Sequence, residues 1–315
     1  MAYKRIGALA VLKSGTIWMD FRLKIFHTVA QVKSFTKAAE ILNLTQPAIT
    51  FQIKNLEEEF CTRLFNRDQN RINLTETGRI LFRHAERILD EYEKASDEIA
   101  RITGVLSGEI RIGVASLLGK YLLPKLIGIF KQTHPNINII MLVGDSAALI
   151  QKIQEHTVDL VIVSEPFSLK NFVVKALIDD EIVVIVHPEH KWAYRNHIEI
   201  EDFHKEPFIA REYGSGLREV FKNFLGSKNI SLKNLKIVMT LGSSEALKSA
   251  VESGVGYTII SNMAVKREIE LGSLKQVPVK GMNLIRRFFI VYSPQHCKKN
   301  VIGAFLNFIY SNIPQ

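Results

Sequence analysis

The sequence predicts an α+β protein of several domains, in which a winged helix-turn-helix, one long helix and a two-lobed α/β domain follow one another. Three observations indicate this order. Residues 34–60 contain two short helical patterns with almost no spacer, and residues 79–103 contain neither glycine nor proline. From residue 107 onward, strand and helix patterns alternate, which is typical of βαβ packing.

The helix pair is the most informative part of the chain. The first helix can begin near Thr36, with Ser34 or Thr36 accepting a hydrogen bond from the first free amides, and it ends at Asn43. The second has Thr45 at the capping position and Pro47 in its first turn, where a missing N–H costs nothing. Two helices joined by such a short turn match the helix-turn-helix, whose second helix enters the major groove of DNA. An ordinary helical hairpin within a core is the alternative.

The exposed face of the second helix is predicted to carry Gln46, Thr50 and Lys54. Gln46 can pair with adenine, Thr50 can reach a base edge or a thymine methyl, and Lys54 can meet a phosphate or guanine. The net charge of +9 does not locate this face, because residues 20–106 hold thirteen basic and thirteen acidic side chains. The position of each charge therefore matters more than the total.

Residues 61–78 alternate short apolar pieces with polar turn residues, and they predict a two-stranded wing. Arg67 and Arg71 flank its tip, where they could contact the DNA backbone or the minor groove. Thr75 or Thr77 would cap the next helix. A solvated hairpin that does not touch DNA is the alternative for each arginine.

The long segment from Arg79 to Thr103 predicts a helix with an apolar seam on a charged rod. Its apolar residues recur at alternating spacings of four and three, a seven-residue repeat that favours pairing with a second helix. Packing on the protein's own globular domain is the competing interpretation, but a helix-turn-helix protein usually needs two copies to read two half-sites. The seam residues are Leu81, Ala85, Ile88, Tyr92, Ala95, Ile99 and Ile102.

Residues 20–106 resemble the N-terminal part of the LysR-type transcriptional regulators of bacteria. The matching residues lie between Phe26 and Leu74 and include Phe-Thr-Lys-Ala-Ala at 35–39 and Thr-Gln-Pro-Ala-Ile-Thr at 45–50. The resemblance implies a winged helix-turn-helix and a linker helix that pairs two subunits. Cys61 departs from the family, which usually has glycine there, and a left-handed conformation at this residue would cost about 1 kcal/mol or more. The predicted DNA-binding residues are Ser34, Thr36, Lys37, Gln46, Pro47, Thr50, Lys54, Arg63, Arg67 and Arg71.

The resemblance extends over the α/β half, where LysR-type regulators have an effector domain similar to type 2 periplasmic binding proteins. Two lobes crossed twice by the chain would leave a ligand cleft between them. We place an N-terminal extension or misassigned start at 1–18, the winged helix-turn-helix at 19–78, the linker helix at 79–106 and the effector domain at 107–315. Lobe I is expected at 107–180 and 281–315, and lobe II at 181–280.

Four loops are expected to converge on the cleft. Residues 113–124 match the segment that opens a helix over it, and free amides at a helix start favour an anion. Ala115 and Leu117 replace the Ser and Thr of many relatives, so that only Ser116 keeps a hydroxyl there. Arg211 is the preferred charged contact, with a salt bridge to Glu212 as its alternative role. The predicted effector-binding residues are Ser116, Leu117, Ser164, Arg211, Ser215, Leu217, Ser243 and Ser244.

Catalytic, metal and cofactor sites are not predicted. The chain has no Gly-x-Ser-x-Gly elbow, Walker loop or His-Glu-x-x-His sequence, and Cys61 and Cys297 alone cannot form a zinc cluster. His187 and His190 favour a surface turn over a metal site because Pro188 interrupts a helix. No segment predicts a secretory signal or a membrane span. A solute-binding protein would not explain the helix pair, and an α/β enzyme would need a catalytic constellation.

The sequence therefore predicts a non-enzymatic, cytoplasmic regulator that binds paired half-sites on double-stranded DNA. We expect a homodimer through the linker helix and a homotetramer through the effector lobes. The segments at 50–54 and 286–292 most resemble family members that regulate sulfur or inorganic carbon assimilation, which indicates a small anionic effector or phosphorylated metabolite.

Overall fold

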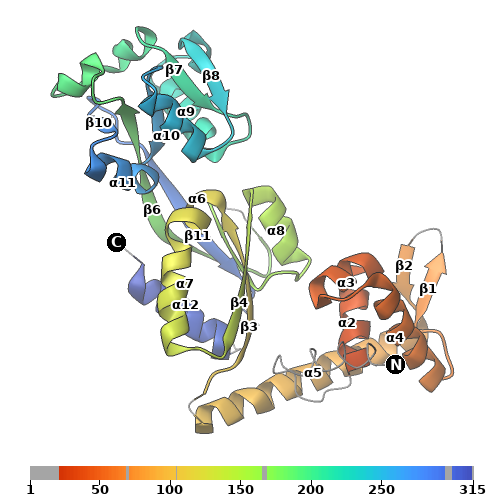
Figure 1. Cartoon of the computed structure of the whole chain (residues 1–315). Coiled ribbons are helices and arrows are strands. Elements are labelled where there is room, and N and C mark those ends of the chain that lie inside the picture. Colours follow the sequence, from red (N-terminus) through yellow and green to blue (C-terminus); the bar gives the residue numbers. More distant parts are fainter. Residues whose placement is uncertain (1–20, 69–70, 104, 165–168, 295–299, 314–315) are drawn as a thin grey trace, which may run out of the picture.

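The computed structural model describes residues 21–68, 71–103, 105–164, 169–294 and 300–313 of the chain. The N-terminal part holds the helices α2 (Phe21–Val32), α3 (Phe35–Leu42) and α4 (Gln46–Glu59), followed by a hairpin of β1 (Phe65–Asp68) and β2 (Arg71–Leu74). The long helix α5 (Glu76–Thr103) leads away from it to the α/β part (Figure 1). The order is that of a winged helix-turn-helix joined to a second folded region.

Capping residues fix the bounds of the helix pair as the sequence predicts. The Ser34 hydroxyl accepts a hydrogen bond from the Lys37 amide at 3.2 Å, and Thr45 accepts one from Ala48 at 3.4 Å. Asn43, between the helices, adopts the left-handed conformation that ends α3. Beneath these helices lies a core of Ile25, Phe26, Val29, Phe35, Ala38, Ala39, Ile49, Ile53, Leu56, Leu64, Phe65 and Ala85.

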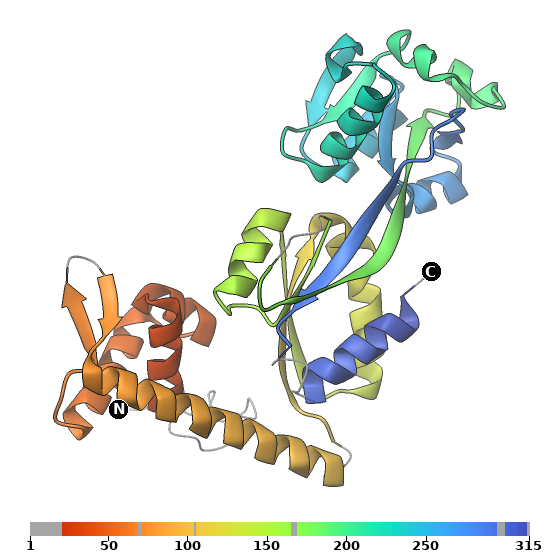
Figure 2. The ribbon, with the colours of Figure 1, turned by 180° about the vertical axis from the view of Figure 1, so that it is seen from behind.

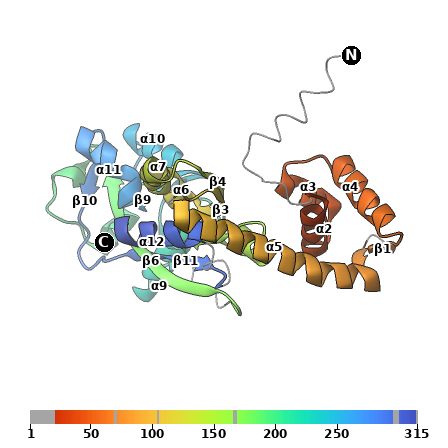
Figure 3. The same ribbon diagram turned by 90° about the horizontal axis from the view of Figure 1, so that it is seen from below.

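The linker helix α5 has two differently packed halves. Near its start, Ala85 is buried in the helix-turn-helix core and Phe82 packs against it. Beyond this point the helix runs clear of that domain, as Figures 2 and 3 show. Ile88, Ile99 and Ile102 of the predicted seam are exposed by 49%, 61% and 87%. The described chain leaves most of the seam uncovered.

One seven-stranded sheet links the two lobes of the α/β part. In the first lobe, β3 pairs in parallel with β4 and β5, while β11 runs antiparallel to both β5 and β6. The strands β6 and β11 are long and cross from one lobe to the other (Figure 1). The bounds are β3 Gly108–Ala115, β4 Ile137–Gly144, β5 Leu160–Val163, β6 Val173–Val186, β9 Thr258–Ser261, β10 Lys275–Val277 and β11 Ile285–Tyr292.

Helices cover the sheet of each lobe. A second, two-stranded sheet of β7 (Phe208–Arg211) and β8 (Ile237–Leu241) belongs to the second lobe, whose core includes Trp192, Phe203 and Tyr257. The helices are α6 Ser116–Tyr121, α7 Leu123–Thr133, α8 Ser146–Gln154, α9 Gly216–Ser227, α10 Ser244–Glu252, α11 Asn262–Leu271 and α12 Asn300–Asn312. Helices α6, α8, α9 and α10 follow strands directly or after short turns, as βαβ packing requires.

The apolar run from Glu181 to Val186 predicts a strand, but this run covers only the second half of β6. The observed strand starts at Val173 and includes Asp179 and Asp180. These carboxylates face Arg287 and Arg286 of β11 in the strand register, and Asp179 binds Arg287 at 2.6 and 2.8 Å. Helix α11 and strand β10 were also not predicted.

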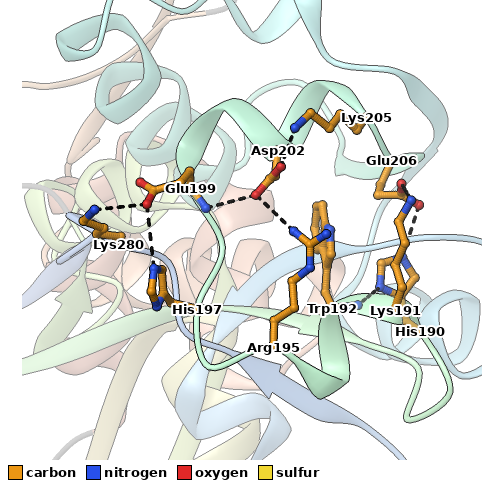
Figure 4. Close-up of polar contacts among 10 residues, drawn as sticks. All are labelled: His190, Lys191, Trp192, Arg195, His197, Glu199, Asp202, Lys205, Glu206 and Lys280. Carbon is orange, nitrogen blue, oxygen red and sulfur yellow. Dashed lines mark hydrogen bonds and ion pairs between the residues drawn. The ribbon is translucent and has the colours of Figure 1, made fainter.

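A polar network covers the outer end of the second lobe (Figure 4), around the 3-10 turns Lys191–Tyr194 and Ile200–His204. Each of three carboxylates contacts two basic side chains. Glu206 contacts His190 and Lys191, Asp202 contacts Arg195 and Lys205, and Glu199 contacts His197 and Lys280. His190 caps the first turn, so the segment 187–190 is a turn as predicted. Within the described ranges, no three His, Cys, Asp or Glu residues could share a metal ion.

Candidate functional site

The predicted recognition face lies on the outside of α4. Gln46 and Lys54 are exposed and Thr50 is partly exposed, on the side opposite the buried Ile49 and Ile53. The Gln46 amide donates to the Thr50 hydroxyl at 3.2 Å, and Lys54 lies 3.5 Å from Glu58. Such exposed contacts are weak and can exchange for contacts with DNA.

Phe51 is a residue of this face that sequence reasoning missed. Its side chain is 61% exposed, although phenylalanine normally enters a core. It follows Pro47 by four residues and precedes Lys54 by three, so the three side chains share one side of the helix. An apolar ring here can contact a thymine methyl group in the major groove. The signal available in the sequence was a phenylalanine out of phase with the buried Ile49, Ile53 and Leu56.

The other predicted DNA contacts have different surroundings. Ser34 serves as the cap of α3, while Thr36, Pro47 and Arg63 are exposed. Lys37 is engaged by the α/β part, because its Nζ lies 2.9 Å from Glu155. The side chains of Arg67 and Arg71 lie outside the described residues, although β1 and β2 pair up to these positions.

The junction of α4 with the wing rests on two residues. Cys61 has a φ of 49°, so the left-handed conformation expected for this non-glycine residue is confirmed. Glu57 accepts hydrogen bonds from the amides of Leu64 (2.8 Å) and Phe65 (3.3 Å). Glu57 thereby holds the start of the wing against the recognition helix, a role that the sequence pattern did not reveal.

A cavity of about 370 Å³ lies between the two lobes. All eight predicted effector residues line it, from loops far apart in the sequence: Ser116, Leu117, Ser164, Arg211, Ser215, Leu217, Ser243 and Ser244. Leu117 and Leu217 lie mostly beneath its surface. Glu165 and Pro166, which follow Ser164, lie outside the described residues. The prediction that these loops converge is confirmed.

The first turns of α8, α9 and α10 face this cavity. Residues 145–147, 215–217 and 243–244 line it, each at the start of a helix. Asp145 and Ser243 cap their own helices, whereas the Ser215 side chain makes no capping bond. Free amides at a helix start carry partial positive charge, so three such starts favour an anion.

The predicted charged contact, Arg211, is already bound within the cavity wall. Its guanidinium donates two hydrogen bonds of 2.7 Å to Glu212 and longer ones to Ser244 and the Gly242 carbonyl. This pairing lowers the pKa of Glu212. Lys120, also in the lining, is exposed and forms no ion pair with any residue described.

A further cation, Arg286, was not predicted as a site residue. It lines the cavity from β11, and its Nη2 donates to Asp180 at 2.6 Å. Asp180 is almost fully buried and accepts a second hydrogen bond from Ser261. Burial raises the pKa of Asp180, against the opposing effect of Arg286. No sequence motif marks this arginine, because its place depends on pairing between distant strands.

A polar contact bridges the lobes at the edge of the cavity. The Tyr121 hydroxyl on α6 donates to Glu245 on α10, and Lys248 binds both Glu245 and Glu268. Burial, followed by the bond to Glu245, raises the pKa of Tyr121 to about 12. The tyrosine therefore remains a neutral donor at physiological pH.

Two family descriptions match this chain. Residues 21–79 match "Bacterial regulatory helix-turn-helix protein, lysR family", and residues 103–313 match "LysR substrate binding domain". The second match alone covers more than half of the chain. The chain belongs to the LysR family. It is a LysR-type transcriptional regulator with a DNA-binding head and an effector-binding domain.

Relatives of this regulator include proteins named for the control of RuBisCO. A "Probable RuBisCO transcriptional regulator" of Phaeodactylum tricornutum is 32% identical, over 91% of this chain and 94% of that protein. The "RuBisCO operon transcriptional regulator" of Allochromatium vinosum is also 32% identical, over 92% and 95%. The CcmR regulatory domain of Synechocystis PCC6803, solved with 2-PG (2-phosphoglycolate), is 27% identical over 66% of this chain and all of that domain, with a TM-score of 0.59.

The relatives that sequence comparison finds are transcriptional regulators. No helix in the described part of the chain has the length and apolar character of a membrane span.

Proposed function

We propose that this LysR-type regulator senses a small anion, most simply a phosphorylated organic acid, in the cavity between its lobes. The observation that carries the proposal is the cavity wall itself. The first turns of α8, α9 and α10 face it, and Lys120 and Arg286 add positive charge. Helix starts and cations together stabilise phosphate and carboxylate groups.

The likeness to CcmR supports this chemistry, because that domain was solved with 2-PG. A cavity of about 370 Å³ has room for a ligand of this size. The names of the relatives point to genes of carbon fixation as the targets. We infer a cytoplasmic protein, since a regulator has to meet DNA.

We further propose that α4 reads the major groove through Gln46, Thr50 and Lys54, with Phe51 beside them. These residues are exposed on one face of a capped helix whose opposite face is buried, which supports the assignment. Thr36, Lys37 and Arg63 would contact the backbone, as would Arg67 and Arg71 at the wing. Two heads held by one dimer would read paired half-sites.

Assembly is proposed to use two kinds of apolar surface. The first is the uncovered seam of α5, which fits a second copy of the same helix. The second lies on strands at sheet edges, where Leu142 and Val143 of β4 and Ile237, Val238 and Met239 of β8 are exposed. Contacts of the first kind would form dimers, and contacts of the second kind would join dimers into a tetramer.

Thermal-shift measurements on the full-length protein test the effector proposal. The probes are 2-phosphoglycolate, inorganic phosphate, sulfate and benzoate, each titrated at fixed ionic strength. We expect 2-phosphoglycolate to raise Tm at the lowest concentration, because a ligand that binds only the folded state stabilises it. Stabilisation by benzoate alone would contradict an anion site built from helix starts and cations.

A gel shift with the promoter DNA of the protein's own operon tests the recognition face. Gln46→Ala and Lys54→Ala should each weaken specific binding, and Lys54→Ala should reduce the salt slope by about 1 if it neutralises a phosphate. Lys24→Ala, an exposed lysine of α2, is the matched control. If the Lys24 variant weakens binding as much as the Lys54 variant, the assignment of α4 is wrong.

A further inference from the structure

The guanidinium of Arg286 occupies an unusual position in the cleft. It projects from β11 at the register position opposite Asp180 of β6, and these are the two strands that cross between the lobes. Nine-tenths of its side chain is buried, and the remainder lines the cavity. Ser261, at the end of β9, donates to the other oxygen of Asp180 at 2.5 Å. Three strands are therefore tied together at the wall where a ligand would rest.

The hydrogen bonds of the two cavity arginines differ sharply. Arginine has five N–H donors in a fixed plane. Every nitrogen of Arg211 donates to a neighbouring protein atom. Arg286 makes one such bond, from Nη2, and its enclosed Nε has no partner in the described chain. Because Asp180 takes only one donor, the part of the guanidinium that lines the cavity can still donate to a polar ligand, although the enclosed Nε itself lies out of a ligand's reach.

We propose that Arg286, rather than Arg211, is the specificity-determining residue for the anionic group of the effector. The inference rests on the proposed function of the cavity and names the group within it that reads the ligand. The planar fork of arginine matches phosphate and carboxylate oxygens, whereas a lysine offers a point charge. The ligand class is a small phosphoryl or carboxyl compound whose anionic group points at the crossing strands.

Neighbouring side chains restrict how the Arg286 guanidinium can be oriented toward a ligand. Phe288 follows Arg286 by two residues, so both lie on the same face of β11, and both line the cavity. The guanidinium carbon lies 4.9 Å from the centre of the Phe288 ring, which limits where the plane can turn. The bound group would therefore meet a positioned fork at the wall, with Lys120 on the side of α6.

Isothermal titration calorimetry of the full-length protein with 2-phosphoglycolate tests the inference. Arg286→Lys keeps the positive charge beside Asp180 but removes the fork. We expect the Kd to rise about tenfold or more, the usual consequence of losing a charge-assisted hydrogen bond. Arg211→Lys should change the Kd less than about threefold, because Arg211 is already occupied by Glu212.

Arg287→Lys is the matched control. This residue is next in sequence and pairs with Asp179 of β6 through two hydrogen bonds, where Arg286 makes one to Asp180, but it does not line the cavity. Its Kd should equal that of the wild type. If Arg286 only held the strands together, Arg286→Lys and Arg287→Lys would both lower Tm, and Arg286→Lys would not selectively raise the Kd for 2-phosphoglycolate.

The measurements distinguish a failure of the proposed function from a failure of the inference about Arg286. If the wild type binds neither 2-phosphoglycolate nor inorganic phosphate, the proposed function fails. If the wild type binds and Arg286→Lys binds equally well, the inference about Arg286 is overturned. Should Arg286→Lys fold poorly, Asp180→Asn replaces it. This change frees the guanidinium from its acid, so tighter binding supports the inference and an unchanged Kd refutes it.

Discussion

Cys61 is a single residue on which the geometry of the DNA-binding head depends. It follows the last turn of α4 with a φ of 49°, and its thiol donates to the Glu58 carbonyl at 3.5 Å. L-residues pay about 1 kcal/mol or more for this conformation, whereas glycine pays nothing comparable. The strain is stored where the recognition helix turns into the wing.

Replacing Cys61 by glycine should therefore stabilise the protein. We expect a gain of about 1 kcal/mol in the free energy of unfolding, reduced by the greater chain entropy of glycine. Chemical denaturation followed by circular dichroism measures it. Cys61→Ser keeps the strain and should not gain stability, so an equal gain in both variants would show that the thiol, not the backbone, is the cause.

His190 makes the second lobe sensitive to acid. Its Nδ1 accepts a hydrogen bond from the Trp192 amide at 3.1 Å, which requires the neutral ring, and burial lowers its pKa. The unfolded chain then binds more protons than the folded chain just below the usual histidine value of about 6.5. This contribution to stability is complete above that pH and is lost as the pH falls below it and through the lower pKa of the folded state.

Urea denaturation between pH 5 and 8, values at which histidine alone among ordinary side chains titrates, measures the effect. His190→Asn keeps an acceptor for the Trp192 amide but cannot titrate. The variant should lose less stability than the wild type on acidification. Parallel curves for the two proteins would show that His190 does not carry the acid sensitivity.

Helix α5 exposes an apolar seam that the rest of the described chain leaves mostly uncovered. Ile99 and Ile102 are highly exposed, whereas Ala85 near the start is fully buried. Ile99→Glu puts a charge into the proposed helix pair, where burial without a partner is costly. We expect the dimer to dissociate, measured as the mass in size-exclusion chromatography with light scattering.

The control for this change is Glu86→Ala on the opposite side of α5. Glu86 is exposed and lies about half a turn from the seam in the 3.6-residue period of the helix. It should leave the mass unchanged. An undiminished mass for Ile99→Glu would mean that the subunits associate elsewhere.

Elements with a local signature were predictable from sequence. The helix pair follows from Ser34, Thr45 and Pro47, which act within a few residues, and the effector loops from short strand-to-helix turns. The first half of β6 was missed because Asp179 and Asp180 break the apolar run that marks a buried strand. Their arginine partners lie more than 100 residues away, so no local pattern contains the pair. Arg286 was missed at the site for the same reason.

For the whole molecule, helix α8 connects the two candidate sites. Its first turn, at residues 145–147, lines the cavity, and Glu155 at its other end binds Lys37 of the DNA-binding head at 2.9 Å. A second contact joins the same parts, because Arg111 donates to the Ile41 carbonyl at 2.6 Å. Helix α8 lies on the side of the first lobe that faces α3 (Figure 1). The contact occupies a lysine predicted to meet DNA.

Glu155→Gln should release Lys37 and tighten DNA binding. The Lys37 ammonium lowers the pKa of Glu155, so the carboxylate is charged near neutral pH and competes with phosphate for the lysine. Fluorescence anisotropy with labelled operator DNA measures the affinity. Glu219→Gln, which breaks a surface pair with Lys222 in the second lobe, is the control. Equal affinities for wild type and Glu155→Gln would exclude this competition.

We propose that the cleft and the DNA-binding head are coupled, and one titration tests this claim. Operator affinity of the full-length protein is measured by anisotropy as 2-phosphoglycolate is added, for the wild type and for Arg286→Lys. We expect the anion to change the operator affinity of the wild type at concentrations near its calorimetric Kd. By reciprocity, operator DNA changes the affinity for the anion by the same factor. Arg286→Lys should need about tenfold more anion for the same change. Saturation of the wild type with 2-phosphoglycolate at constant operator affinity would contradict the claim.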